Sequence, residues 1–171
     1  MDMTAHKFQR KLSVSDLPPV PKKHCRWCGE PCPGKRRNWC SQVCVDEYMI
    51  RSSPSAVSRA IWARDRGVCA LCGLDTSLLR SETRRYFKLL RDCHIHGTPN
   101  RQGPWKTHGR LWEADHVIPV IEGGGCCGLD GYRTLCLPCH RRETAALATR
   151  RAEKRKNAKN ISTREAHKID G

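Results

Sequence analysis

The chain lacks any long hydrophobic run and contains few aromatic residues. No stretch approaches the ~18 consecutive apolar residues of a membrane-spanning helix, so we expect no membrane partner. The first residues, 1–11, are polar and basic and contain no secretory signal peptide. Both absences indicate an intracellular protein, and we expect it in the cytoplasm of a prokaryote or encoded by a phage. Aromatic residues make up only 6% of the chain, so its core would be thin and would need cross-links.

Acidic residues are also scarce relative to basic ones. The chain has 32 Lys and Arg against 17 Asp and Glu, which gives a formal net charge of +15 at pH 7. An excess of this size favours a polyanionic partner, and we expect DNA, either duplex or branched. The alternative is a basic, well-solvated protein with no such partner.

Cysteine, by contrast, is abundant, with 12 residues. In a reducing interior, closely spaced cysteines usually bind metal, and a C-x2-C turn presents two thiolates to a tetrahedral zinc ion. Two C-x2-C turns predict one structural zinc site, with the ligands Cys69, Cys72, Cys136 and Cys139. A C-x2-C turn followed by C-x3-C predicts a second, with the ligands Cys25, Cys28, Cys40 and Cys44.

The second site has competing ligands nearby. Cys32 and His24 lie close enough in the sequence to replace one of its four cysteines. The remaining Cys93, Cys126 and Cys127 are expected to be free thiols.

Capping residues and apolar spacing predict a small number of elements. We expect helices over about 43–49, 53–66, 77–92 and from 137 onwards, an exposed loop over 93–110, and a β-hairpin over 111–121. The predicted domains are a flexible N-terminal segment (1–23), a zinc knuckle with four cysteines (24–53), a main domain (54–150) and a basic C-terminal tail (151–171).

The segment 112–144, WEADHVIPVIEGGGCCGLDGYRTLCLPCHRRET, resembles the HNH endonuclease family. The family pattern has an Asp-His pair on a strand, a Gly-rich loop, an Asn, and a helix that opens with Cys-x-x-Cys-His. The chain presents Asp115-His116, Gly123 to Gly125 and Cys136-x-x-Cys139-His140 in that order. It is also more loosely similar to the nuclease module of an annealing helicase with a RAN-binding zinc finger, although the helicase motor is absent.

The resemblance implies a small, zinc-stabilised α+β fold with a ββα-metal core that is treble-clef-like, an N-terminal zinc knuckle and added helices. It implies hydrolysis of DNA phosphodiester bonds, with His116 as the general base and Asp115 and His140 as ligands of a catalytic metal ion. Mg²⁺ or Mn²⁺ suits this set of ligands. Because neighbouring strand residues point to opposite faces, a bulge or turn at Asp115-His116 would have to bring both to the site. In the alternative interpretation, His140 belongs to the neighbouring zinc and His116 is structural.

Two positions depart from the family pattern. Gly131 stands where the family has its middle Asn; it could adopt the same positive-φ turn but supplies no amide, unless Asp130 replaces it. Thr144 stands where some relatives have a second metal-binding His. Both departures leave low activity open, and with it the alternative of a non-catalytic, zinc-dependent nucleic-acid-binding module. An RNA-directed nuclease is a further alternative.

Basic residues of the last helix are the predicted contacts to DNA phosphates. The candidates, with one residue from the segment before this helix, are Arg133, Arg141, Arg142, Arg150 and Arg151. A solvated basic helix is the alternative. Of the tryptophans, Trp105 and Trp112 could stack on bases, but packing is the stronger expectation for Trp112.

Overall fold

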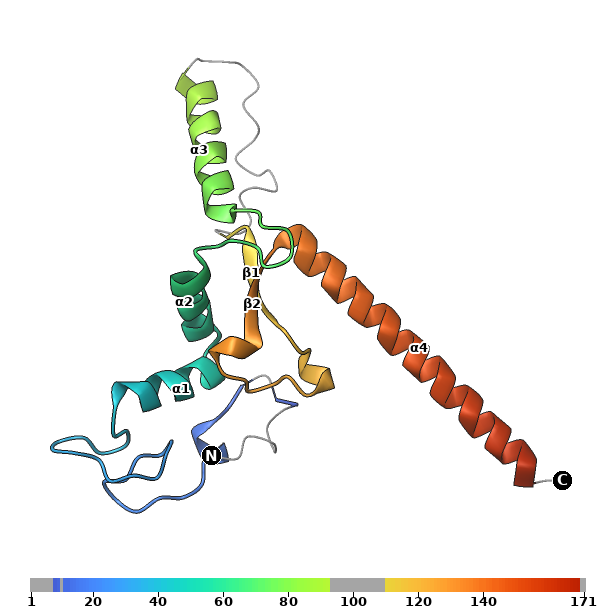
Figure 1. Cartoon of the computed structure of the whole chain (residues 1–171), viewed down its shortest axis with the longest axis horizontal. Coiled ribbons are helices and arrows are strands. Elements are labelled where there is room, and N and C mark those ends of the chain that lie inside the picture. The colour runs from blue at the N-terminus through green and yellow to red at the C-terminus, as the bar shows by residue number, and fades with distance from the viewer. Residues whose placement is uncertain (1–7, 10, 93–109, 170–171) are drawn as a thin grey trace.

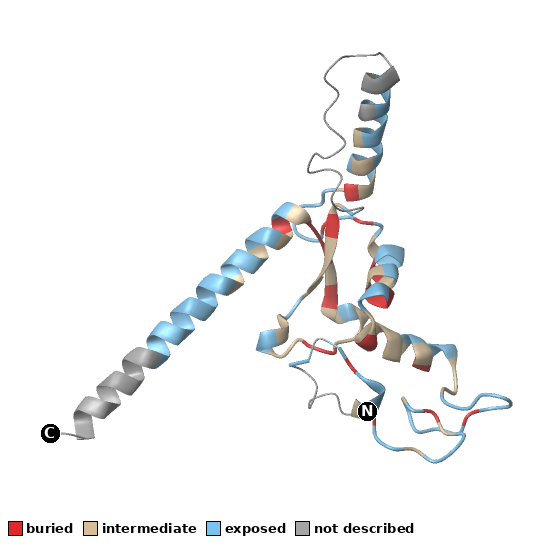
Figure 2. Ribbon diagram, turned by 180° about the vertical axis from the view of Figure 1, so that it is seen from behind, coloured by how far each residue is buried: buried red, intermediate tan, exposed pale blue. Residues whose placement is uncertain are grey.

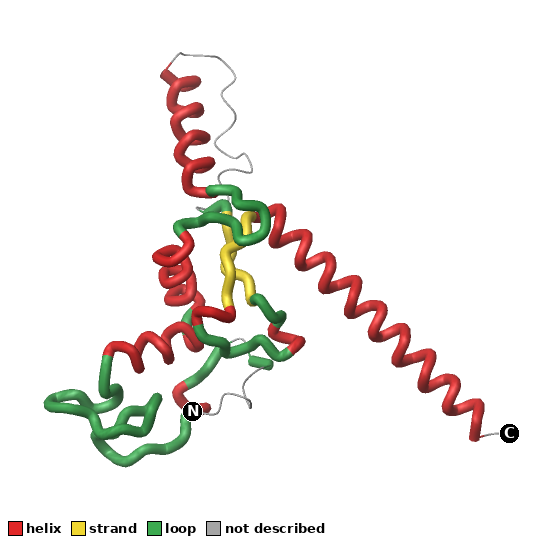
Figure 3. The backbone as a smooth tube through the Cα atoms, viewed as in Figure 1, coloured by secondary structure: helices red, strands yellow, loops and turns green. Residues whose placement is uncertain are grey.

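The computed structural model describes residues 8–9, 11–92 and 110–169. They form a small α+β fold (Figures 1 and 3). In chain order the elements are η2 (Val14–Asp16), α1 (Gln42–Ser52), α2 (Pro54–Asp65), α3 (Thr76–Asp92), β1 (Trp112–His116), η4 (Val120–Glu122), η5 (Leu129–Gly131), β2 (Tyr132–Cys136) and α4 (Leu137–Ile169). In the described part of the chain, no helix is both long and apolar enough to cross a membrane.

The sheet consists of β1 and β2, paired antiparallel, and α4 follows β2 directly. This order confirms the expected ββα core. Figure 1 shows α2 on one side of the sheet and α4 on the other. The register places Asp115 opposite Arg133 and His116 opposite Tyr132, in regular pairing that continues to the end of β1. The expected bulge at Asp115-His116 is therefore not found.

The predicted β-hairpin within 111–121 is wrong in its second half. Its first strand is β1, but the apolar stretch that follows forms a tight turn around η4 instead of a strand. Pro119 cannot donate a ladder hydrogen bond, and its carbonyl accepts from the amides of Glu122 at 2.8 Å and Gly124 at 3.1 Å. The partner strand, β2, comes from further along the chain.

Helix α2 begins and ends close to the predicted positions. The Ser53 side chain accepts a hydrogen bond from the amide of Ala56, and Pro54 occupies the first turn, where its missing N–H costs nothing. The left-handed residue at its C-cap is Arg66, with φ 54°. Gly67 follows in the same region of φ, at 83°.

Apolar residues of α2 pack against the sheet to form the main core. Val57 and Ile61 are buried against Trp112 of β1 and Tyr132 of β2. Figure 2 shows buried residues concentrated around the sheet and the helices that pack on it. At the end of α2, Arg64 donates to the Tyr132 carbonyl at 2.8 Å. The core therefore holds β2 to α2 by both apolar contact and hydrogen bonds, which fixes the strand that leads into α4.

The N-terminal segment 1–23, expected to be flexible, is packed over part of its described length. Leu12 is completely buried and Leu17 nearly so, in a cluster with Cys126. The Leu12 amide donates to the Arg51 carbonyl at 2.8 Å. The packing of this segment was not predictable from the sequence, because two isolated leucines show no helical or strand periodicity. Of the loop expected over 93–110, residues 93–109, with Cys93 and Trp105, lie outside the described residues.

Helix α4 runs without interruption through the predicted boundary between residues 150 and 151. The division into domains stays a prediction. Helix α3 also forms where expected, but Leu78, Leu79 and Leu89 on it are exposed rather than packed in the core.

Candidate metal centres and active site

The structure brings the first predicted set of zinc ligands together. The sulfur atoms of Cys69, Cys72, Cys136 and Cys139 all lie within 4.8 Å of one another. The first pair sits in a tight turn in which the Gly73 amide donates to the Cys69 carbonyl at 2.9 Å. Gly73 has φ 72°, a conformation that favours glycine and explains its place directly after Cys72. The second pair ends β2 and opens α4, so this cluster ties the helix to the sheet.

The second set forms a similar cluster from Cys25, Cys28, Cys40 and Cys44, again within 4.8 Å. Its first pair repeats the turn, because the Gly29 amide donates to the Cys25 carbonyl at 2.8 Å and Gly29 has φ 82°. The two competing candidates, Cys32 and His24, are not part of the group. Neither is His140 part of the first group, although it follows Cys139 directly.

Both clusters fit zinc in their geometry. Tetrahedral coordination with Zn–S bonds of about 2.3 Å separates the sulfurs by about 3.8 Å. The Cys72 and Cys136 sulfurs are 3.7 Å apart, and those of Cys28 and Cys44 are 3.8 Å apart. Among the described residues, these are the groups of three or more possible metal ligands gathered this closely. Two four-cysteine sites compatible with structural zinc are therefore present.

The thiols of each cluster are electrostatically unequal. Burial raises the pKa of Cys69, but hydrogen bonds from the backbone of Cys136, Cys72 and Leu71 outweigh it and lower the pKa to about 6. The hydrogen bond with the neighbouring Cys136, aided by burial, raises the pKa of Cys139 to about 12. Full deprotonation of four adjacent thiols therefore needs a cation, which zinc would supply.

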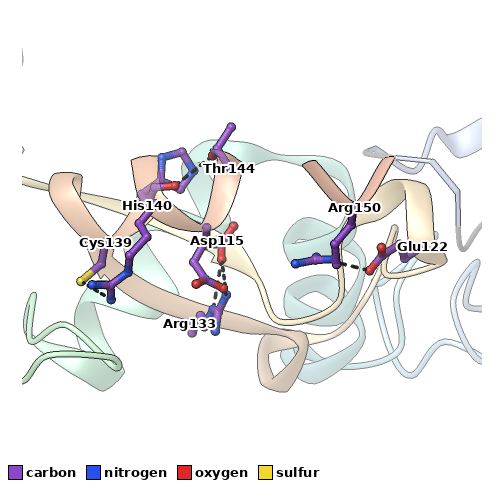
Figure 4. Close-up of polar contacts among 9 residues, drawn as sticks. Asp115, Glu122, Arg133, Cys139, His140, Thr144 and Arg150 are labelled. Atoms are coloured by element: carbon purple, nitrogen blue, oxygen red, sulfur yellow. Dashed lines mark hydrogen bonds and ion pairs between the residues drawn. The ribbon is translucent and has the colours of Figure 1, made fainter. Parts of the chain in front are cut away.

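The three predicted catalytic residues line one cleft of about 420 Å³ between the end of β1 and α4. Asp115 and His116 line it from β1, and His140 lines it from the first turn of α4. Figure 4 shows Asp115 and His140. All three side chains are partly buried. The sequence thus identified residues from separate elements that share a cavity, although their proposed roles stay predictions.

Arg133 lines this cleft and binds two carboxylates. Its guanidinium donates to Asp115 Oδ2 from Nε at 3.0 Å and from Nη2 at 2.9 Å. The Nη2 atom also donates to Glu143 Oε2 at 2.9 Å. Burial lowers the pKa of Arg133, but the hydrogen bonds to Glu143 and Asp115 outweigh it, and the net shift is upward. Arg133, expected to contact DNA, is thus held inside the site.

Glu143 is a site residue that the sequence argument missed. It lines the same cleft as Asp115 and His140 and lies three residues after His140 on α4. Residues at this spacing share one face of a helix, so the signal was present in the sequence. Glu143 adds a second carboxylate to the cleft. Carboxylate oxygens are ligands that a hard divalent cation prefers, but among the described residues Asp115, Glu143 and His140 are not gathered within 4.8 Å of one another, and both carboxylates bind Arg133.

The two histidines of the cleft are held in different ways. The His116 ring packs on the Tyr132 ring, with centroids 4.4 Å apart and planes inclined by 45°. His140 projects from α4, where Thr144 Oγ1 donates to its backbone carbonyl at 2.9 Å (Figure 4). Thr144, which stands where some relatives have a second His, also lines the cleft.

Gly131 is required by close packing and not by a positive φ. It belongs to η5 and is not among the residues with positive φ. A Cβ atom at this position would lie 2.5 Å from both Cβ and Sγ of Cys127. The expected left-handed turn is therefore wrong, and an Asn side chain does not fit here without movement. Asp130 is exposed and is not among the residues that line the cleft.

The predicted DNA-contacting arginines of α4 fall into two groups. Arg150 and Arg151 line the cleft, and Arg150 lies 3.9 Å from Glu122 of η4 (Figure 4). Arg141 and Arg142 are exposed outside the cleft lining, and Arg142 donates to the Cys139 sulfur at 3.6 Å. Only the first pair could contact a phosphate that is bound in the cleft.

Comparison with known proteins identifies the same protein from several mammals as similar to this chain. The sequence matches no protein-family model. It is 34% identical over 122 residues to the mouse DNA annealing helicase and endonuclease ZRANB3, and 32% identical over 124 residues to the human protein. These matches cover 66–67% of the chain but only 11–12% of the relatives' length. The relatives are mammalian, so they give no support to the prokaryotic or phage origin that we expected.

A solved structure, the HNH domain of human ZRANB3, is 30% identical in sequence and is matched over 95% of its length and 60% of this chain, with a TM-score of 0.41. The matched region thus spans nearly the whole of that single domain. The chain is homologous to ZRANB3 within its HNH domain and belongs to the HNH family.

Proposed function

We propose that the chain is a metal-dependent endonuclease that hydrolyses DNA phosphodiester bonds in the cleft between β1 and α4. The observation that supports this most strongly is the meeting of Asp115, His116 and His140 in one cavity of about 420 Å³. A purely structural zinc protein has no need of this set beside its cysteine clusters. The relatives are each named as a DNA annealing helicase and endonuclease, which agrees with the proposal.

In the proposed mechanism, Asp115 and His140 would hold a Mg²⁺ or Mn²⁺ ion, which would supply charge stabilisation of the phosphate and of the leaving 3′ oxygen. His116 removes a proton from the attacking water. Its Nε2 atom is buried, so the proposal assigns this role to Nδ1. Packing against Tyr132 limits rotation of the ring and orients this base. The products would carry 5′-phosphate and 3′-hydroxyl ends.

Arg133 has a positioning role in this proposal. Its two hydrogen bonds fix the Asp115 carboxylate, and its positive charge offsets the repulsion between Asp115 and Glu143. Arg150 and Arg151, at the side of the cleft, would bind the phosphates next to the cleaved one. We also propose two structural zinc ions, one in each cysteine cluster, and an intracellular setting in which these thiols stay reduced.

The test is nicking of supercoiled plasmid by the zinc-loaded chain with Mg²⁺ or Mn²⁺. His116→Ala is expected to slow nicking by about 10²- to 10⁴-fold, the usual contribution of a general base. His24→Ala is a matched histidine control, because His24 lies outside both the cleft and the zinc groups. Equal nicking by wild type and His116→Ala would refute the assignment of the base. Parallel assays on duplex DNA, single-stranded DNA and RNA identify the substrate class.

A second candidate is a non-catalytic, zinc-dependent nucleic-acid-binding module. The observations that favour it are Gly131 in place of the family's Asn and the engagement of Asp115 by Arg133. If the wild-type chain binds plasmid but cuts it with neither cation, this candidate replaces the endonuclease.

A further inference from the structure

A groove lined by tryptophan and arginine lies at the opposite end of β1 from the cleft. It consists of two adjoining hollows of about 130 Å³ and 290 Å³, both lined by Trp62, Arg80, Arg110 and Trp112. Arg59 and Arg84 complete its basic lining. Trp112 begins β1 and His116 ends it, so groove and cleft are separated by about 13 Å along the strand.

Two stacked tryptophan rings line this groove. The Trp62 and Trp112 rings are nearly parallel, with planes inclined by 18° and centroids 6.1 Å apart. Trp112 is 5% exposed and belongs to the core, whereas Trp62 is 39% exposed although it lies on the same helix as buried Val57 and Ile61. Gly67 allows this arrangement, because a Cβ there would lie 2.9 Å from the Trp62 ring. An exposed tryptophan is therefore held in a fixed orientation.

The charged residues that line the groove are all positive. Its lining contains four arginines and no carboxylate. In the described part of the chain, none of the four takes part in an ion pair. Arg80 and Arg84 are four residues apart on α3, a spacing at which like charges repel unless an anion lies between them. The groove therefore fits a ligand that carries several negative charges.

We propose that this groove binds single-stranded DNA, with an unpaired base stacked on Trp62 and the adjoining phosphates on Arg80, Arg84, Arg59 and Arg110. An aromatic ring gains from a nucleic acid only when a base face is uncovered, which is the case in a single strand and not within a duplex. A duplex would engage the arginines alone. The site is separate from the cleft and does not depend on cleavage.

The test measures binding of a fluorescein-labelled dT12 strand and of a 12-base-pair duplex by anisotropy, using the full chain with no added Mg²⁺ or Mn²⁺. Trp62→Leu keeps an apolar side chain against Trp112 but removes the stacking ring. It is expected to weaken single-strand binding about tenfold and duplex binding by less than about twofold. Trp62→Phe is expected to retain most of the affinity. Equal affinity of Trp62→Leu and wild type for dT12, or an equal loss for the duplex, would overturn the proposal.

A second variant covers the case in which Trp62→Leu fails to fold. Arg80→Gln/Arg84→Gln changes two side chains on the surface of α3 and is expected to reduce the slope of log affinity against log salt for dT12 by about 1.4. Arg36→Gln/Arg37→Gln removes the same charge from the N-terminal knuckle, where both residues are exposed, and should leave the slope unchanged. An unchanged slope in the first variant, or an equal reduction in both, would contradict the assignment. Because no cleavage is measured, these outcomes are independent of the nuclease proposal.

Discussion

The close approach of Cys127 to Gly131 predicts that restoring a side chain at position 131 harms the protein. In Gly131→Ala, the new Cβ would lie 2.5 Å from both Cβ and Sγ of Cys127. The Cβ atom is fixed to the backbone, so η5 or the loop before it would have to move. Overpacking of this kind costs about 1–3 kcal/mol, partly offset by about 0.4–1 kcal/mol from the stiffer unfolded chain.

The expected net loss is about 1–2 kcal/mol, which corresponds to a fall of about 2–8 °C in melting temperature for a chain of this size. Thermal unfolding followed by circular dichroism, with zinc present, measures it. Gly128→Ala is the matched control. Its Cβ would meet only the end of the Arg51 side chain, at 3.0 Å, and its φ of −71° suits alanine. We expect this control to melt within about 2 °C of wild type.

A double-mutant cycle isolates the contact. Cys127→Gly removes both atoms that the new Cβ would meet, so Gly131→Ala should cost less in that background, by about 1 kcal/mol or more. Gly131→Asn should fail to raise nicking for the same reason. If Gly131→Ala melts at or above the wild-type temperature, the packing explanation for this glycine is wrong and the missing Asn needs another account.

Two other predictions concern stability. Cys136→Ser should lower the zinc content from two ions per chain to one and lower the melting temperature. The control Cys126→Ala lies outside both clusters and should keep two ions. Inductively coupled plasma mass spectrometry measures the zinc content. Thr134→Val removes the 2.7 Å hydrogen bond from buried Thr134 to Asp65 and should cost about 1.5–3 kcal/mol. A hydrogen bond from Arg64 lowers the pKa of Asp65, so its stabilisation is complete above about pH 4 and is lost only as pH falls through the folded pKa. The difference in melting temperature between wild type and Thr134→Val should therefore be constant from pH 6 to 8.

Local features were predictable from the sequence. The two C-x2-C-G turns are local because each is closed by a hydrogen bond between residues four apart. The cap formed by Ser53 and Pro54 is similarly local. Each feature depends on residue types within one turn of chain, so spacing alone predicts it.

Features that depend on strand register were not predictable in this way. The engagement of Asp115 by Arg133 requires the two residues to face each other across the sheet. The sequence argument instead placed a hairpin within 111–121, because Val117 to Ile121 are apolar enough to form a second strand. The reason for a glycine at position 131 was also not predictable, because it is a contact with another part of the chain. The Cys127 side chain leaves no room for a Cβ there, whereas the backbone conformation of Gly131 does not itself require glycine.

Helix α4 gives the molecule a length scale. Its 33 residues extend about 50 Å, starting beside His140 in the cleft and leaving the sheet (Figure 1). At about 3.4 Å per base pair, a duplex lying along the whole helix would need about 15 base pairs. Under the proposed function, a duplex held along this helix would therefore extend about 15 base pairs to one side of the cut, and oligonucleotides shorter than this span would leave the far end of the helix without contacts.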